Sequence, residues 1–166
     1  MNSQIFQSVI NMKEAIFYKK KDKLDVKCGL CPHRCLIKNH NTGLCSVRKN
    51  IDGKLYSVVY DKINTMHIDP IEKKPLFHFH PGKKAMSIAT MGCNFSCTFC
   101  QNADLSQSPK QDMIKGENIS PEKIVEITEK KDCKIIAYTY SEPTIFYELA
   151  YDTAKIAHNK GIKNVF

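Results

Sequence analysis

Residues 90–102 read TMGCNFSCTFCQN and directly follow AMSIA, a mostly apolar run at residues 85–89. The three cysteines of this stretch, Cys93, Cys97 and Cys100, are too few for a closed tetrahedral zinc site but can hold three irons of a four-iron cluster. The fourth iron would then stay open to a small molecule, since thiolates are the soft ligands that iron-sulfur clusters take. The alternative is that these cysteines are buried thiols or part of an ordinary zinc knuckle.

The spacing Cys93-x3-Cys97-x2-Cys100 resembles the signature of the radical S-adenosylmethionine (radical SAM) superfamily. In that family the open iron chelates the amino and carboxylate groups of the cofactor, and an electron from the cluster cleaves it to a 5′-deoxyadenosyl radical. Phe99 strengthens the resemblance, because the family usually carries an aromatic residue just before its third cysteine, beside the adenine. The resemblance therefore implies a [4Fe-4S] cluster and S-adenosyl-L-methionine as cofactors.

A second group of cysteines lies nearer the N-terminus and consists of Cys28, Cys31, Cys35 and Cys45. Glycine and proline between them permit tight turns, so the spacing predicts a closed metal site. Zinc and an auxiliary iron-sulfur cluster both accept four thiolates, and the sequence leaves the choice between them open. The remaining cysteine, Cys133, is interpreted as a buried thiol without a role.

The N-terminal half predicts few regular elements. Apolar residues recur at helical spacing over residues 3–20, which predicts an amphipathic helix with a basic end. Residues 55–60 are β-prone and follow a turn, so they predict a strand. Residues 69–79 contain two prolines that disfavour a regular helix, and we interpret them as a loop.

Downstream of the cysteine loop, strand and helix patterns alternate. Residues 120–131 and 144–160 predict helices, and residues 134–139 and 163–166 predict strands. Together with the strand at residues 85–89, this order predicts a parallel sheet with right-handed crossovers. The cysteine loop would then lie at the C-terminal edge of the sheet, where such folds keep their chemistry.

The second of these strands ends in YTYSEPT at residues 138–144. In radical SAM proteins the corresponding position carries a Gly-Gly-Glu-Pro type motif that binds the methionyl amino group. Glu142 and Pro143 match this motif, whereas Tyr140 and Ser141 stand in place of the glycines. The resemblance thus assigns Glu142 to the amino group of the cofactor. The alternative is a carboxylate on a surface loop.

The predicted fold is α/β: an incomplete radical SAM (β/α) partial TIM barrel, preceded by a small four-cysteine metal-binding module. Residues 1–80 would hold the N-terminal helix, the module and a connecting segment, and residues 81–166 the first part of the barrel. A full barrel takes roughly 250 residues, so we expect this one to stop after about two βα units and one strand. The chain would be a truncated gene product, a fragment or one half of a split protein.

The charge pattern bears on partners. The formal net charge is +8, but Arg34 and Arg48 are the only arginines and the lysines are dispersed. Phosphate and guanine recognition favours arginine, so nucleic acid is an unlikely partner. The sequence has no apolar run long enough to span a membrane and no secretion signal, which predicts a cytoplasmic protein without a membrane partner.

Four features together resemble one group more specifically: the four-cysteine group, residues 69–79, the turn at Pro81 and Gly82, and the Cys-Gln-Asn end of the cysteine loop. This group is the radical SAM protein of the AmmeMemoRadiSam system, a relative of the pyruvate formate-lyase activating enzymes. The resemblance implies an activating-enzyme-like oxidoreductase that abstracts hydrogen from an unknown protein or small molecule and needs an electron donor. The alternatives are an RNA-modifying radical SAM enzyme and a non-catalytic iron-sulfur or zinc-binding fragment.

Overall fold

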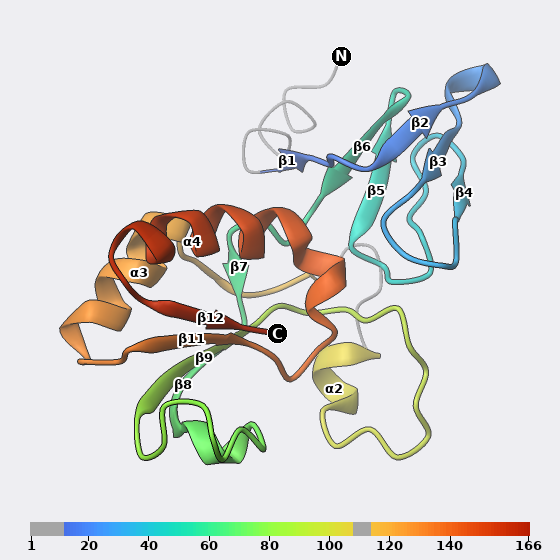
Figure 1. Cartoon of the computed structure of the whole chain (residues 1–166). Coiled ribbons are helices and arrows are strands. Elements are labelled where there is room, and N and C mark those ends of the chain that lie inside the picture. The colour runs from blue at the N-terminus through green and yellow to red at the C-terminus, as the bar shows by residue number, and fades with distance from the viewer. Residues whose placement is uncertain (1–11, 108–113) are drawn as a thin grey trace.

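The sheet that leads into the cysteine loop has four strands in the order β12-β11-β9-β8 (Figure 1). The computed structural model describes residues 12–107 and 114–166. Strands β9 (Lys84–Ala89), β11 (Ile135–Tyr138) and β12 (Lys163–Val165) are parallel, and β8 (Thr65–Pro70) pairs antiparallel with β9. β9 and β11 are buried on both faces, which explains their continuous apolar runs.

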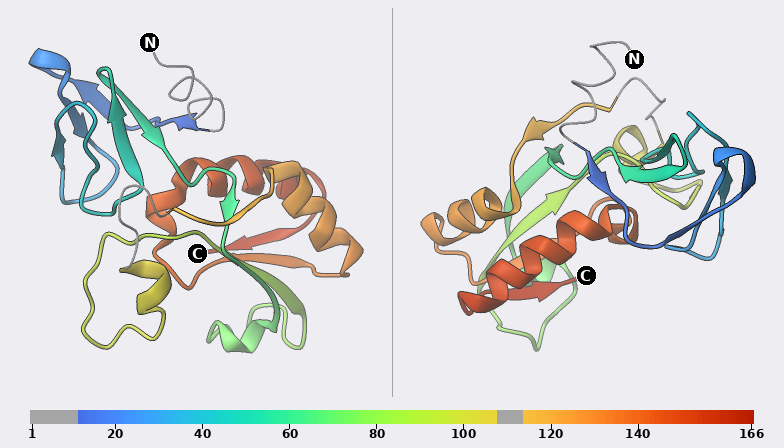
Figure 2. Two further views of the ribbon diagram at one scale, coloured as in Figure 1. Left: turned by 180° about the vertical axis from the view of Figure 1, so that it is seen from behind. Right: turned by 90° about the horizontal axis from the view of Figure 1, so that it is seen from above.

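Helices α3 (Pro121–Lys130) and α4 (Tyr147–Asn159) lie together on one face of this sheet (Figure 2). Ser120 caps α3, because its hydroxyl accepts a hydrogen bond from the Lys123 amide at 3.3 Å. The core between the helices and the sheet includes Met86, Ile88, Ile124, Val125, Ile136, Phe146 and Leu149. The predicted alternation of strands and helices over residues 85–166, and the parallel pairing of its strands, are therefore confirmed.

The other face of the sheet is covered by the segment between β8 and β9. This segment begins with a single 3-10 turn, η2 (Ile71–Lys73). Its apolar side chains form a second core with the sheet, made by Ile71, Leu76, Phe79, Ala85, Ile135, Ala137 and Val165. The loop predicted at residues 69–79 is thus partly ordered as the end of β8 and a 3-10 turn.

Two small antiparallel sheets form the N-terminal part of the described chain. One contains β1 (Lys13–Glu14), β6 (Lys54–Ser57) and β5 (Arg48–Ile51), and the other contains β2 (Tyr18–Lys20), β3 (Val26–Cys28) and β4 (Leu36–Ile37). The strand predicted at residues 55–60 corresponds to β6, which ends earlier. The remaining elements are η1 (Asp22–Leu24), β7 (Lys62–Ile63), α2 (Ala103–Ser106), β10 (Glu117–Asn118) and η3 (Pro143–Phe146).

The helix predicted over residues 3–20 is wrong in its second half, where β1 and β2 lie. Its first half falls outside the described residues. Ala15 donates its backbone N–H to the Leu55 carbonyl at 2.8 Å, and β2 pairs with β3. These long-range pairings satisfy the backbone, so tertiary structure overrides the helical spacing of the apolar residues.

A buried ion pair joins the N-terminal sheets to α4. Arg48 on β5 and Glu148 on α4 are 2% and 1% exposed, and their side chains meet at 2.8 Å (Nη1 to Oε1) and 2.7 Å (Nη2 to Oε2). The same Oε1 accepts the Ile16 amide at 3.0 Å. The pair therefore fixes the N-terminal sheets against the helical layer.

The four-stranded sheet is open and mixed, and the predicted partial TIM barrel is not seen among the described residues. Three parallel strands are too few to close, since closure demands a complete ring of tilted strands. The α/β class of the prediction is nevertheless correct. Within the described ranges, every helix is too short or too polar to cross a membrane.

Candidate functional site

The cysteine loop, residues 90–102, leaves the C-terminal end of β9 and reaches α2 in a wide excursion beyond the sheet edge (Figure 1). Cys93 and Cys100 are half-buried near its two ends, and Cys97 is exposed at its middle. Phe99 is 84% exposed. The loop therefore presents its thiols and this aromatic ring at the edge of the sheet where the sequence predicts the site.

Local hydrogen bonds anchor both ends of the loop. The Gly92 amide donates to the Leu105 carbonyl at 3.0 Å, and Gln107 Nε2 donates to the Phe95 carbonyl at 2.8 Å. Cys100 Sγ lies 3.3 Å from the hydroxyl of Ser106, a buried residue of α2. Ser106 was missed by sequence reasoning, because a serine six residues after a cysteine carries no signal of its own.

The donor set suits an iron-sulfur cluster, because three thiols on one loop are the ligands that such clusters take. In the described part of the chain, however, no group of three or more Cys, His, Asp or Glu side chains lies close enough to hold a metal ion. Binding a cluster thus requires the loop to draw its thiols together. Cys97, between two anchored ends, is the most exposed of the three thiols.

Two hydrogen bonds tie the segment after β11 to the cysteine loop. Ser141 Oγ donates to the Thr90 carbonyl at 2.8 Å, and Asn102 Nδ2 donates to the Tyr140 carbonyl at 3.2 Å. The predicted meeting of residues 138–144 with the loop at one sheet edge is therefore confirmed. These contacts connect the segment to Thr90 and Asn102, the first and last residues of the cysteine loop.

Glu142 is half-buried, and its carboxylate caps η3. Oε1 accepts the Thr144 hydroxyl at 2.6 Å and the Thr144 amide at 3.2 Å. Glu142, Pro143 and Thr144 also line a cavity of about 760 Å³ together with aromatic residues such as Phe17 and Tyr147. The carboxylate is thus a hydrogen-bond acceptor that already has local donors.

A buried carboxylate that sequence reasoning did not single out lies beside this segment. Asp69 is 5% exposed, and four groups donate to it: Lys73 Nζ, Lys74 Nζ and Ser87 Oγ at 2.8 Å each, and the Tyr140 hydroxyl at 2.7 Å. Burial raises the pKa of Asp69, but these hydrogen bonds outweigh it and hold the pKa well below its usual range. The paired lysines shortly after an aspartate were the available signal.

The four N-terminal cysteines line one small cavity of about 10 Å³, with His33 and Asn94 also on its wall. The four cysteines are Cys28, Cys31, Cys35 and Cys45. Burial raises the pKa of the Cys28 and Cys45 thiols. As elsewhere in the described chain, the thiols are not drawn together tightly enough to hold an ion. Cys133 is buried as predicted.

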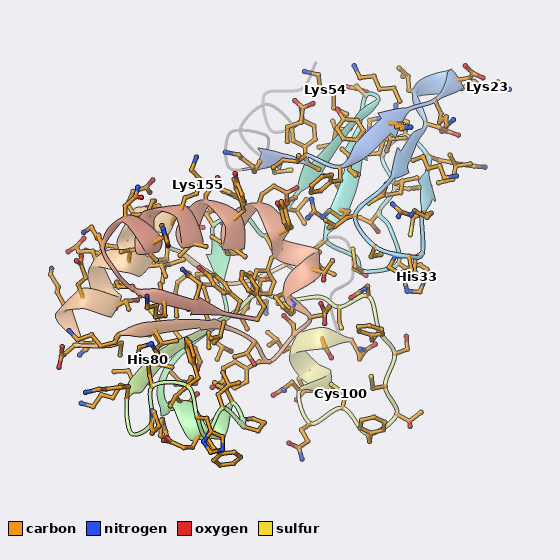
Figure 3. All side chains as sticks on the ribbon, viewed as in Figure 1. Lys23, His33, Lys54, His80, Cys100 and Lys155 are labelled. Carbon is orange, nitrogen blue, oxygen red and sulfur yellow. The ribbon has the colours of Figure 1, made fainter. Side chains whose placement is uncertain are left out.

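This cysteine cavity adjoins the cysteine loop. His33 Nε2 lies 2.7 Å from the Asn94 carbonyl oxygen. Gly92 has a φ of +93°, and a Cβ on it would lie 2.6 Å from Val47 Cγ1 and 2.7 Å from the Cys45 carbonyl oxygen. Figure 3 shows His33 on the side of the N-terminal sheets that faces the loop carrying Cys100. The two cysteine groups therefore share a packed boundary.

Part of the chain is similar to a known protein family. Residues 87–166 match the family model described as the Radical SAM superfamily. This region includes the cysteine loop and Glu142, so the predicted resemblance is confirmed at the level of the superfamily. The relation to the AmmeMemoRadiSam group stays a prediction.

Two similar proteins come from Methanocaldococcus jannaschii, and both are described as uncharacterized. One is 49% identical over 154 residues, which cover 93% of this chain and 46% of the relative. The other is 30% identical over 101 residues, which cover 54% of this chain and 25% of the relative. The chain thus spans less than half the length of each relative. No solved structure matches it significantly.

Proposed function

We propose that the chain carries the cluster-binding part of a radical SAM enzyme, in which Cys93, Cys97 and Cys100 hold a [4Fe-4S] cluster. The observation that carries this proposal is the superfamily match over residues 87–166, which contains the three cysteines on one loop. When bound, the cluster and S-adenosyl-L-methionine supply a 5′-deoxyadenosyl radical for hydrogen abstraction. The open mixed sheet would be the start of a partial barrel.

The chain's own residues bind and orient the cofactor in this proposal. Cys93, Cys97 and Cys100 would hold three irons of the cluster, and the fourth iron would be available to the methionyl group. The exposed ring of Phe99 is available to cover the adenine. Glu142 accepts a hydrogen bond from the methionyl ammonium. Because Oε1 already accepts from Thr144, this bond goes to the second carboxylate oxygen, Oε2.

We further propose an activating-enzyme-like reaction on a protein or small-molecule substrate, with a separate electron donor. The support is the sequence resemblance of the four-cysteine group and residues 69–79 to the radical SAM protein of the AmmeMemoRadiSam system, a relative of the pyruvate formate-lyase activating enzymes. The RNA-modifying alternative is less well supported, because Arg34 and Arg48 are the only arginines and Arg48 is buried in an ion pair.

For the four-cysteine group we propose a structural metal site, because its four cysteines line one small cavity. Zinc and an auxiliary iron-sulfur cluster both accept four thiolates. Four thiolates leave no open position for a substrate, so the metal would stabilise the fold. The boundary between this module and the sheet domain, predicted near residue 80, remains part of the proposal.

Anaerobic reconstitution with iron and sulfide tests the cluster. We expect one four-iron cluster per chain, visible by absorbance and by electron paramagnetic resonance after reduction. Changing Cys93, Cys97 and Cys100 together to Ala should remove the cluster, whereas the control Cys133→Ala should keep it. A cluster that survives the triple substitution would refute the assignment, and a chain without iron would favour the non-catalytic alternative.

A further inference from the structure

Tyr140 adopts a backbone conformation that is unusual for a tyrosine. Its φ is +64°, and across it the Ser141 amide donates to the Thr139 carbonyl at 2.9 Å. A three-residue turn with positive φ at its centre is a rare and strained form of γ-turn. Such strain persists only where the surroundings hold it.

The side chain of Tyr140 is held by β8 and by the segment that follows β8. Its hydroxyl donates to Asp69 Oδ2 at 2.7 Å, and Lys74 Nζ lies 4.6 Å from the centre of its ring. Asp69 cannot easily shift, because it is buried and also accepts from Ser87 on β9. The ring is therefore held by Asp69 on β8 and by Lys74 just after η2, both of which are distant from Tyr140 in sequence.

The turn sets the direction of the residues that follow. The Tyr140 carbonyl accepts from Asn102 at the end of the cysteine loop, and Ser141 donates to Thr90 at its beginning. Glu142 is the next residue. If Tyr140 relaxed to negative φ, its carbonyl and both of its successors would point elsewhere.

We propose that Asp69 is a positioning residue that holds the turn at Tyr140 and thereby keeps Tyr140 and Ser141 in contact with the cysteine loop, directly before Glu142. Glycine adopts positive φ without strain, whereas tyrosine needs an external hold. The Asp69–Tyr140 hydrogen bond supplies that hold at a position where a glycine would need none. The effect on cofactor binding rests on the proposed function, but the effect on the turn does not.

Hydrogen-deuterium exchange of the full chain tests the hold directly, read at the Ser141 amide. Tyr140→Phe removes only the hydroxyl bond and leaves Asp69 with its lysine and serine partners, so the variant should fold. We expect exchange to become roughly three- to tenfold faster, the change that follows from losing one hydrogen bond. The matched control is Tyr138→Phe, which removes a tyrosine hydroxyl bond to Asn164 at the end of β11, just before the turn.

A rescue experiment separates positioning from general stability. Asp69→Asn should also speed exchange at Ser141, and the double variant Asp69→Asn/Tyr140→Gly should restore slow exchange, because glycine keeps the turn unaided. Equal exchange in wild type and Tyr140→Phe would overturn the inference. So would a double variant that exchanges as fast as Asp69→Asn alone.

Titration of the reduced cluster with S-adenosyl-L-methionine, followed by electron paramagnetic resonance, completes the test. We expect Tyr140→Phe to bind it several-fold more weakly than wild type. If wild type binds none while exchange responds as expected, the proposed function fails and the role of Asp69 in the turn stands. If wild type binds it and neither exchange nor affinity responds to the substitutions, the role of Asp69 fails and the proposed function stands.

Discussion

Gly92 lies at the boundary between the two cysteine groups, at a place where a Cβ atom would clash with its neighbours. Its positive φ disfavours other residues, and the space beside its Cα is filled by Val47 and the Cys45 carbonyl. Neither neighbour can give way easily, since Val47 is fully buried and the carbonyl belongs to the backbone. The residue is thus fixed by conformation and by space at once.

Gly92→Ala should therefore destabilise the chain by about 2–4 kcal/mol, combining overpacking with backbone strain. Urea unfolding measures the difference. The matched control is Gly82→Ala, because Gly82 also has positive φ (+71°) but no atom within 4 Å of the added Cβ. The control should lose only the strain, about 1 kcal/mol. Equal losses in both variants would show that the packing at Gly92 is loose.

At the scale of elements, the ion pair between β5 and α4 links two parts of the chain that are otherwise distant in sequence. Arg48 and Glu148 are both almost fully buried, so each charge depends on the other for compensation. Removing one partner leaves an uncompensated buried charge, whereas removing both leaves none.

Glu148→Gln should destabilise the chain by about 3–5 kcal/mol, and the double variant Arg48→Met/Glu148→Leu should recover much of that loss. Urea unfolding of wild type, of the single variants Arg48→Met and Glu148→Leu, and of the double variant gives the coupling energy. Lys130→Ala, which breaks an exposed pair with Glu126, is the control and should cost far less than Glu148→Gln. A double variant as unstable as the worse single one would contradict the expectation.

The elements that sequence reasoning found are those whose signals are local. Ser120 and Pro121 mark the start of α3 within a few residues, and the apolar runs of β9 and β11 indicate burial by themselves. The errors arose where distant pairing decides. Residues 13–20 form strands because of partners in β6 and β3, which no helical spacing can reveal.

In the candidate site, too, the residues with a local sequence signal were found and the residue placed by distant contacts was missed. The cysteines of the loop and Glu142 were found because their spacing carries a family signature. Asp69 was not, since its contact with Tyr140 joins residues 71 positions apart. Asp69 lies in β8 just before Pro70, and its carboxylate is buried by the pairing of β8 with β9 and by the packing of the following segment against the sheet.

On the scale of the whole molecule, the N-terminal cysteine module and the cysteine loop are in direct contact. His33 contacts Asn94, and Gly92 packs against Val47 and Cys45. A change in the module is thus transmitted by direct contact to the residues on either side of Cys93.

Cys31→Ser should release the module's metal, one equivalent per chain, and should also lower the fraction of chains that retain the cluster during dilution. Elemental analysis measures the first effect and the decay of cluster absorbance the second. Cys133→Ser is the control, because Cys133 lies in the other core and should change neither. A variant that keeps its full metal content and stability would remove the module from the proposal.

The packed boundary at Gly92 also implies an order of maturation. Cys45 and Val47 leave the ribosome before Gly92, and domains generally fold from the N-terminus onward during synthesis. The residues against which the loop settles are therefore synthesised before the loop itself. Under the proposed function, iron would enter a loop whose neighbours at this boundary are already in the chain.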